Sequence, residues 1–76
     1  MPRLRYEYLV CYDVEDNKTR TRLYKQLLAY GLRPVQKSVL WGFLTAAECA
    51  SVKRLLSKHI EVKGSQDKAL VIPTAL

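Results

Sequence analysis

The sequence has few of the residues that break a chain or cross-link it. Its 76 residues include three glycines, three prolines, two cysteines and one histidine, and the apolar runs are short. No run approaches the ~18 residues of a membrane span, and the N-terminus does not resemble a signal peptide. The cysteines lie far apart in apolar stretches, which argues against a disulfide framework or a zinc site. We therefore expect one globular domain over residues 1–76, in the cytoplasm, with no membrane contact.

The small size of the chain points to self-association. A domain this short buries only about 60% of its unfolded surface and is marginally stable alone. Because disulfides and zinc are not expected to stabilise it, oligomerisation is the remaining common solution, and the sequence predicts a homodimer. A large enclosed cofactor pocket is not expected in so small a body.

Acidic residues are absent from a long central stretch. The net charge is +6, and no Asp or Glu lies between Asp16 and Glu48. A field of one sign attracts polyanions, so this stretch favours nucleic-acid binding. The alternative is a solvated basic face that only maintains solubility. The basic residues of the stretch are Lys18, Arg20, Arg22, Lys25, Arg33 and Lys37.

Apolar periodicity alternates between the strand and helix types along the chain. Residues 6–12 are apolar on both faces, as expected for a central strand. Asp16 or Asn17 can cap the first helix, Gly31 can end it, and Thr45 with Glu48 forms a capping box for the second. The predicted helices span residues 18–30 and 46–60, and the later strands span 34–40, 42–44 and 69–73.

The order of these elements is β-α-β-β-α-β. It predicts an α+β fold, a ferredoxin-like βαββαβ sandwich in which two helices cover one face of an antiparallel sheet. The other face is then open and apolar. We expect the homodimer to form through this open sheet face. The break near Gly42 is interpreted as a turn, a bulge or a kink in one long strand.

Asp13 is the candidate for chemistry. It ends the first strand in phase with Leu9 and Cys11, so it faces the open side of the sheet. There it can meet its copy in a second subunit, and two facing carboxylates favour a hard divalent cation such as Mg²⁺ or Mn²⁺. The alternative is an ordinary turn or capping aspartate. Tyr12 can donate a hydrogen bond near Asp13 or simply pack.

Several segments together resemble a known family, the small CRISPR-associated adaptation protein that is often labelled an endoribonuclease and that partners the CRISPR integrase. The resemblance covers nearly the whole chain. It is carried, in order, by Tyr12-Asp13-Val14, Asn17 through Arg22, Tyr30-Gly31-Leu32-Arg33, Val35-Gln36-Lys37-Ser38-Val39, Gly42, Leu44-Thr45 and Leu70 to Pro73.

The resemblance implies a ferredoxin-like homodimer in which Asp13 is the metal-binding and catalytic acid, with one Mg²⁺ or Mn²⁺ ion shared between the two subunits. It also places Tyr12, Arg20 and Arg22 on positions tied to nuclease function. Tyr12 is therefore a second predicted catalytic residue. The predicted nucleic-acid contacts are Arg20, Arg22, Arg33 and Lys37.

The chain departs from the family pattern at three places. The family often has an aromatic residue where this chain has Leu40, with Trp41 displaced by one. An arginine that is common before the Val-Gln pair is Pro34 here, with Arg33 one step earlier. The chain also stops three residues after Pro73, so the tail that crosses to the partner subunit is expected to be short or absent.

Three functions fit the sequence. The first is a metal-dependent endonuclease of CRISPR spacer acquisition that cleaves single-stranded RNA or double-stranded DNA and also bridges the integrase on DNA. The second is a non-catalytic DNA-binding scaffold of the integrase complex. The third, outside the family, is a toxin-type RNase or an RNA-binding ferredoxin-like module.

Overall fold

The protein is described by a computed structural model that covers residues 4–60 and 67–74. The sequence predicts a loop at Gly64-Ser65-Gln66-Asp67, of which only Asp67 lies within the described residues, and of the residues after Pro73 only Thr74 does. The elements in chain order are β1 (Arg5–Asp13), α1 (Asn17–Ala29), β2 (Arg33–Gln36), β3 (Val39–Thr45), α2 (Ala46–Ile60) and β4 (Lys68–Pro73).

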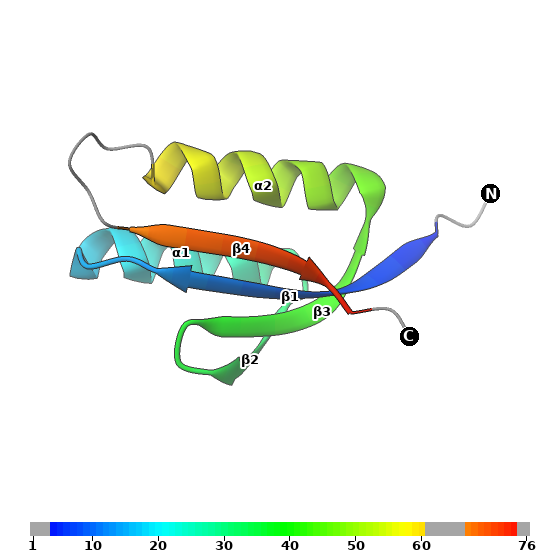
Figure 1. The fold of residues 1–76 in the computed structure, drawn as a ribbon, viewed down its shortest axis with the longest axis horizontal. Coiled ribbons are helices and arrows are strands. Elements are labelled where there is room, and N and C mark those ends of the chain that lie inside the picture. The colour runs from blue at the N-terminus through cyan, green and yellow to red at the C-terminus, as the bar shows by residue number, and fades with distance from the viewer. Residues whose placement is uncertain (1–3, 61–66, 75–76) are drawn as a thin grey trace.

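The strands form one antiparallel sheet in the order β2-β3-β1-β4. β1 is therefore a central strand, as predicted, and β2 and β4 are the two edge strands of the sheet. Both helices pack on the same face of the sheet. In Figure 1, α2 is drawn above β4 and β1, and α1 is drawn behind them. The order and layering confirm the predicted ferredoxin-like sandwich.

The core lies between the helices and the sheet. Even-numbered side chains of β1, such as Val10, point toward the helices because successive residues of a strand face opposite sides. They meet Leu23 and Leu27 of α1 and Val52 and Leu56 of α2, all of which are buried. Leu28 of α1 lies beside this buried stripe and is 37% exposed, although its helical spacing with Leu23 and Leu27 in the sequence favours an inward position.

The helix ends agree with the sequence signals. The Thr19 backbone N–H donates to Asp16 Oδ2 at 2.8 Å, so Asp16 is the N-cap of α1. Gly31, just past α1, has a φ of 87°, which suits glycine. At α2, Thr45 N–H donates to Glu48 Oε1 at 2.8 Å and Glu48 N–H donates to Thr45 Oγ1 at 3.1 Å. This pair is the predicted capping box.

The boundary between the second and third strands was predicted in the wrong place. The turn lies at residues 37–38, and β3 runs without interruption through Gly42. Ser38 adopts a φ of 65°, and Val35 lies at a register shift opposite β3. The apolar alternation of Val35, Val39 and Trp41 continues in phase across this tight turn, so the pattern did not reveal it.

Gly42 is required by packing against the segment that precedes β2. A Cβ at this position would lie 2.9 Å from Leu32 Cδ2 and 3.2 Å from Leu32 Cα. Contacts this short would force the segment around Leu32 to shift. Gly42 is therefore neither a turn nor a strand break; it allows Leu32 to pack tightly onto β3.

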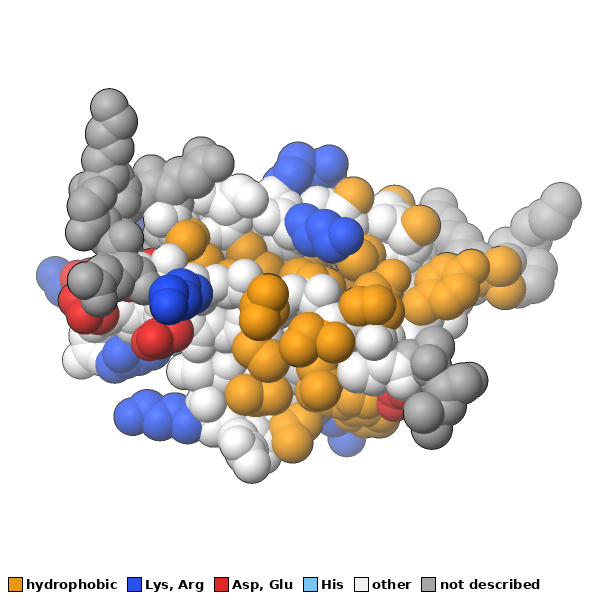
Figure 2. Space-filling view, viewed as in Figure 1, with side chains coloured by type: hydrophobic (Ala, Val, Ile, Leu, Met, Phe, Trp, Pro, Cys, Tyr) orange, Lys and Arg blue, Asp and Glu red, His pale blue; other side chains and the backbone are white. Residues whose placement is uncertain are grey.

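The face of the sheet opposite the helices is apolar and uncovered in the single chain. Phe43 is 50% exposed, Leu70 is 62% exposed and Ile72 is 40% exposed. Figure 2 shows apolar side chains gathered over the strands, with charged side chains concentrated toward one end. We call this surface the open face. Within residues 4–60 and 67–74, no helix is long and apolar enough to cross a membrane.

Candidate nucleic-acid interface and metal centre

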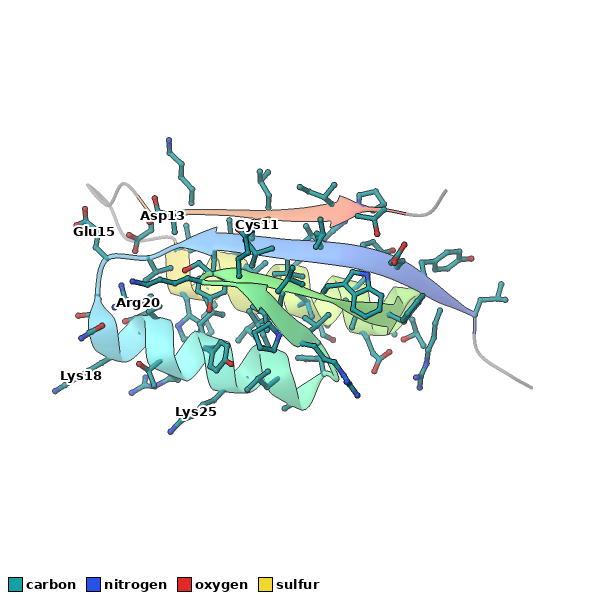
Figure 3. The ribbon with its side chains drawn as sticks, turned by 90° about the horizontal axis from the view of Figure 1, so that it is seen from below. Cys11, Asp13, Glu15, Lys18, Arg20 and Lys25 are labelled. Atoms are coloured by element: carbon teal, nitrogen blue, oxygen red, sulfur yellow. The ribbon has the colours of Figure 1, made fainter. Side chains whose placement is uncertain are left out.

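Asp13 lies at the end of β1 with its side chain on the open face. It is exposed, whereas Tyr12 and Val14 on either side of it are buried on the helix side. In the sheet, Asp13 pairs with Lys68 of β4, and Figure 3 shows it at the C-terminal end of β1. The predicted phase of Asp13 with Leu9 and Cys11 is confirmed.

A shallow hollow of about 290 Å³ surrounds Asp13 on this face. Its polar lining includes Ser38 and two lysines, Lys37 from the β2–β3 turn and Lys68 from β4. Its apolar lining includes Cys11 and Leu70. One carboxylate therefore shares the hollow with two cationic side chains, an arrangement that can attract a phosphate as well as a metal ion.

The Tyr12 ring lies on the opposite face of β1 from the Asp13 carboxylate, although Tyr12 also contributes to the lining of the hollow around Asp13. Its ring points to the helix side, where only 6% of the residue is exposed. Burial, reinforced by nearby Tyr24, raises the pKa of the Tyr12 hydroxyl above its ordinary value of 10.0, and Arg20 opposes this in part. The hydroxyl is therefore protonated at neutral pH and can donate a hydrogen bond.

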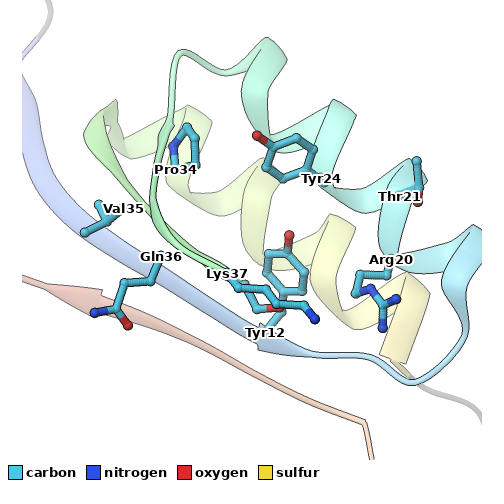
Figure 4. Close-up of a pocket in the computed structure, with 9 residues that line it drawn as sticks. Tyr12, Arg20, Thr21, Tyr24, Pro34, Val35, Gln36 and Lys37 are labelled. Carbon is cyan, nitrogen blue, oxygen red and sulfur yellow. The ribbon is translucent and has the colours of Figure 1, made fainter.

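A second hollow of about 360 Å³ lies between α1 and the β2–β3 turn. We call it the α1–hairpin groove. Tyr12 is in its floor, and Arg20 and Lys37 approach from opposite sides (Figure 4). The residues that line it are Tyr12, Arg20, Thr21, Tyr24, Pro34, Val35, Gln36, Lys37 and Ser38.

Arg20 is held in place by the backbone that links β1 to α1. Its Nη1 donates to the Val14 carbonyl at 3.1 Å, and its Nη2 donates to Asn17 Oδ1. A guanidinium has five N–H donors, so most of them are left for a ligand. Arg20 thus has a structural contact as well as a free face toward the groove.

The other two predicted nucleic-acid contacts lie elsewhere. Arg22 is exposed on another side of α1, in a shallow surface hollow with Lys18 and Lys25. Arg33 is exposed at the end of β2 away from the turn, opposite Trp41. Of the four predicted contacts, the fold brings only Arg20 and Lys37 into one hollow.

Within the described residues, the carboxylates near the end of β1 do not form a three-ligand metal site. Asp13 and Glu15 follow each other closely there (Figure 3), and Asp67 Oδ1 accepts a hydrogen bond from the Glu15 N–H at 3.1 Å. Even so, no group of three His, Cys, Asp or Glu side chains converges within the described part of the chain. A hard cation at Asp13 therefore needs oxygen ligands in addition to those of the described residues, such as a second Asp13 or a phosphate.

Lys68 and Tyr24 line these hollows but were not predicted from the sequence as site residues. Lys68 reaches the hollow around Asp13 because β4 pairs with β1 in a register that places the two opposite each other. Tyr24 lines the α1–hairpin groove one helical turn after Arg20. The spacing of Arg20 and Tyr24 was visible in the sequence, whereas the register of β4 on β1 was not.

Known proteins resemble this chain in sequence. The family CRISPR associated protein Cas2 matches over residues 6–74. The CRISPR-associated endoribonuclease Cas2 1 of Francisella tularensis subsp. novicida is 58% identical over 60 residues, which cover 79% of this chain and 62% of that protein. A protein of the same name from Methanospirillum hungatei is 44% identical over 54 residues, covering 66% of this chain and 57% of its own. The matched segments thus span less than two thirds of either curated relative.

Solved structures agree with this match. A hypothetical protein from Thermus thermophilus superimposes with a TM-score of 0.81 and 27% identity, covering 96% of this chain and 85% of that one. A crystal structure described as cas2 superimposes with a TM-score of 0.70 and 26% identity, covering 92% of this chain and 77% of that one. The predicted family is thereby confirmed: by the extent of the sequence match and by its fold, this chain belongs to the family CRISPR associated protein Cas2.

Proposed function

We propose that this protein is a metal-dependent endonuclease of CRISPR spacer acquisition, and that it acts as a cytoplasmic homodimer joined through the open face. The observation that carries the proposal is the position of Asp13, an exposed carboxylate at the edge of an apolar surface. The two curated relatives of this chain described above are named as endoribonucleases, which supports the nuclease assignment. Single-stranded RNA or double-stranded DNA is the proposed substrate.

The homodimer follows from the exposed apolar side chains of the open face. Removing apolar surface from water is favourable by about 25 cal/mol per Å² before the entropic cost of association is subtracted, and Phe43, Leu70 and Ile72 are all available for it. Asp13 lies in the same layer of side chains, so a two-fold axis near the end of β1 would bring two Asp13 carboxylates together. Such a pair repels itself unless a cation or a proton lies between them.

The proposed metal site takes its oxygen ligands from both subunits of the dimer. Two Asp13 carboxylates would hold one Mg²⁺ or Mn²⁺ ion, because hard cations prefer oxygen ligands. When bound, the ion lowers the pKa of a coordinated water and stabilises negative charge on a phosphate. Lys37 and Lys68, which share the hollow with Asp13, bind and orient the phosphate of the substrate.

Cleavage by purified protein tests this function. Single-stranded RNA and double-stranded DNA are incubated with wild type, Asp13→Asn and Glu15→Gln, with Mg²⁺ and with EDTA. Glu15→Gln removes the same charge two residues away, outside the hollow around Asp13. We expect Mg²⁺-dependent cleavage by wild type and Glu15→Gln and none by Asp13→Asn. Cleavage by Asp13→Asn at the wild-type rate would refute the proposed role of Asp13.

A second function is favoured by the charge around Asp13. Two lysines and a single carboxylate line the hollow, so it can bind a phosphate without any metal. This arrangement supports a non-catalytic scaffold that holds DNA for the CRISPR integrase. If wild type binds duplex DNA in EDTA and cleaves neither nucleic acid with Mg²⁺, the scaffold replaces the nuclease.

The homodimer is tested by sedimentation at micromolar concentration. Leu70→Glu places a charge on the open face, where Leu70 is 62% exposed, and should give a monomer. Leu28→Glu makes the same change on α1, where the side chain is 37% exposed, and should leave the dimer intact. A dimer that survives Leu70→Glu would show that association uses another surface.

A further inference from the structure

The α1–hairpin groove has an excess of positive charge. Two of its lining residues, Arg20 and Lys37, are cationic, and none is acidic. Within residues 4–60 and 67–74, the Lys37 ammonium has no hydrogen bond or ion pair, and Arg20 uses only two of its donors. Two cations that converge without a counter-charge favour an anion between them.

Hydroxyl groups add neutral donors to the same space. The Tyr12 hydroxyl points into the groove toward Tyr24, as Figure 4 shows, and no hydrogen bond satisfies it within the described residues. Because burial keeps this hydroxyl protonated, it can donate to a phosphate oxygen. A phosphate at this position would receive bonds from a guanidinium, an ammonium and a phenol.

The walls of the groove suit a base. Tyr24 from α1 and Pro34 from β2 present ring surfaces above Tyr12 (Figure 4). Stacking of a base on an aromatic side chain contributes about 1–3 kcal/mol and does not depend on the base. The volume of about 360 Å³ falls within the size range of small-molecule sites, roughly 300–1,000 Å³.

We propose that the α1–hairpin groove binds one nucleotide, with its phosphate between Arg20 and Lys37 and its base against Tyr24 and Pro34. This site lies on the other side of β1 from the Asp13 carboxylate. Tyr12, Lys37 and Ser38 line both hollows, so the β2–β3 turn and the end of β1 connect them. The inference deepens the proposed nucleic-acid function and rests on it for the natural ligand: a strand would place one nucleotide in the groove and pass over the turn toward Asp13.

The test uses adenosine 5′-monophosphate as the probe, with adenosine and inorganic phosphate for comparison. Affinity is measured by calorimetry on the full chain in EDTA, and ¹H–¹⁵N NMR shifts locate the ligand. We expect the monophosphate to bind at least about tenfold more tightly than either partial ligand, because only it uses both the cations and the rings. The largest shifts should fall at Tyr12, Tyr24 and Lys37.

Matched variants then assign the two halves of the site. Lys37→Ala should weaken binding of the monophosphate by about tenfold, the loss of one charge-assisted hydrogen bond. Tyr24→Leu, which keeps an apolar side chain, should weaken it similarly while leaving inorganic phosphate unaffected. Lys53→Ala removes the same charge on α2 outside the groove and should change the affinity less than about twofold.

Two outcomes would overturn the proposal. Equal affinity for the monophosphate and inorganic phosphate would show that the base makes no contact. NMR shifts confined to the outer surface of α1 around Arg22 would show that the ligand does not bind in the groove. Neither result depends on cleavage, because EDTA removes metal chemistry. Loss of cleavage in Asp13→Asn together with no binding in the groove would retain the nuclease and refute this inference. Binding in the groove without any cleavage by wild type would retain this inference and refute the proposed nuclease.

Discussion

Tyr12 and Asp13 are adjacent in β1, and their side chains lie on opposite faces of the sheet. The Tyr12 ring is buried beneath the helices and lines the α1–hairpin groove, whereas the Asp13 carboxylate is exposed on the open face. A strand alternates its side chains in this way at every step. The two predicted catalytic residues of one chain therefore cannot act on the same atom from the same side.

This separation predicts different kinetic effects at the two positions. Tyr12→Phe keeps the packing and removes only the hydroxyl, so it should raise the KM for a nucleic-acid substrate and leave kcat within about twofold. Asp13→Asn should lower kcat by several orders of magnitude with a small effect on KM. Steady-state kinetics with Mg²⁺ measure both. A loss of kcat in Tyr12→Phe equal to that of Asp13→Asn would show that the two groups act together.

Arg20 and Arg22 should differ in their effect on stability. Arg20→Ala removes the bond to the Val14 carbonyl at 3.1 Å and should reduce the free energy of unfolding by about 1–3 kcal/mol. Arg22→Ala removes the same charge from an exposed position and should change it by less than about 0.5 kcal/mol. Urea denaturation measures both variants. Equal losses would mean that net charge, rather than the local bond, determines the effect.

Both arginine variants should weaken nucleic-acid binding through charge. Each phosphate neutralised contributes about 0.7–0.9 to the log–log slope of affinity against salt, so each variant should flatten the slope by up to that amount. Filter binding at salt concentrations from about 50 to about 300 mM measures the slope for each variant. Binding that does not change with salt would contradict the electrostatic basis of the interaction.

Gly42→Ala should destabilise the fold by about 1–3 kcal/mol, because its Cβ would lie 2.9 Å from Leu32 Cδ2. Leu32→Ala removes that atom and costs about 2–5 kcal/mol by itself. The double variant should lose less than the sum of the two, with a coupling of about 0.5–3 kcal/mol. Simple additivity in thermal unfolding would show that the close approach to Leu32 is not what requires glycine here.

The N-cap of α1 should make stability depend on acid pH. Hydrogen bonds from the Thr19 hydroxyl and then the Thr19 N–H lower the pKa of Asp16 below its ordinary value of 3.8. Because the folded pKa is the lower one, the stabilisation is complete above pH 3.8 and is lost as the pH falls through the folded value. Thermal midpoints of wild type and Asp16→Asn from pH 5 to pH 2, roughly the range in which carboxylates protonate, should therefore converge as the acid is protonated. Parallel curves would exclude Asp16 as the titrating group.

Local signals in the sequence were sufficient for most elements. Both helices began and ended within one residue of their predicted limits, because capping groups such as Asp16, Gly31 and the Thr45–Glu48 pair act on neighbouring backbone atoms. The apolar run of β1 marked a central strand, and its alternation placed Asp13 on the open face. These features depend on residues close in sequence, so the sequence contains them directly.

Other features depend on which segments meet, and only the tertiary structure decided them. The apolar alternation keeps its phase across the turn at residues 37–38, so the sequence pattern did not predict that turn. Gly42 was interpreted as a break, whereas in the structure it allows the close approach of Leu32. The register of β4 on β1 brought Lys68 opposite Asp13. The same folding of the β2–β3 turn against α1 brought Lys37 to Arg20 and left Arg22 and Arg33 apart. Sequence alone determined which residues carry charge and which face of their own element they occupy, whereas the pairing of distant strands and helices, which no local backbone preference specifies, decided which charges share a site.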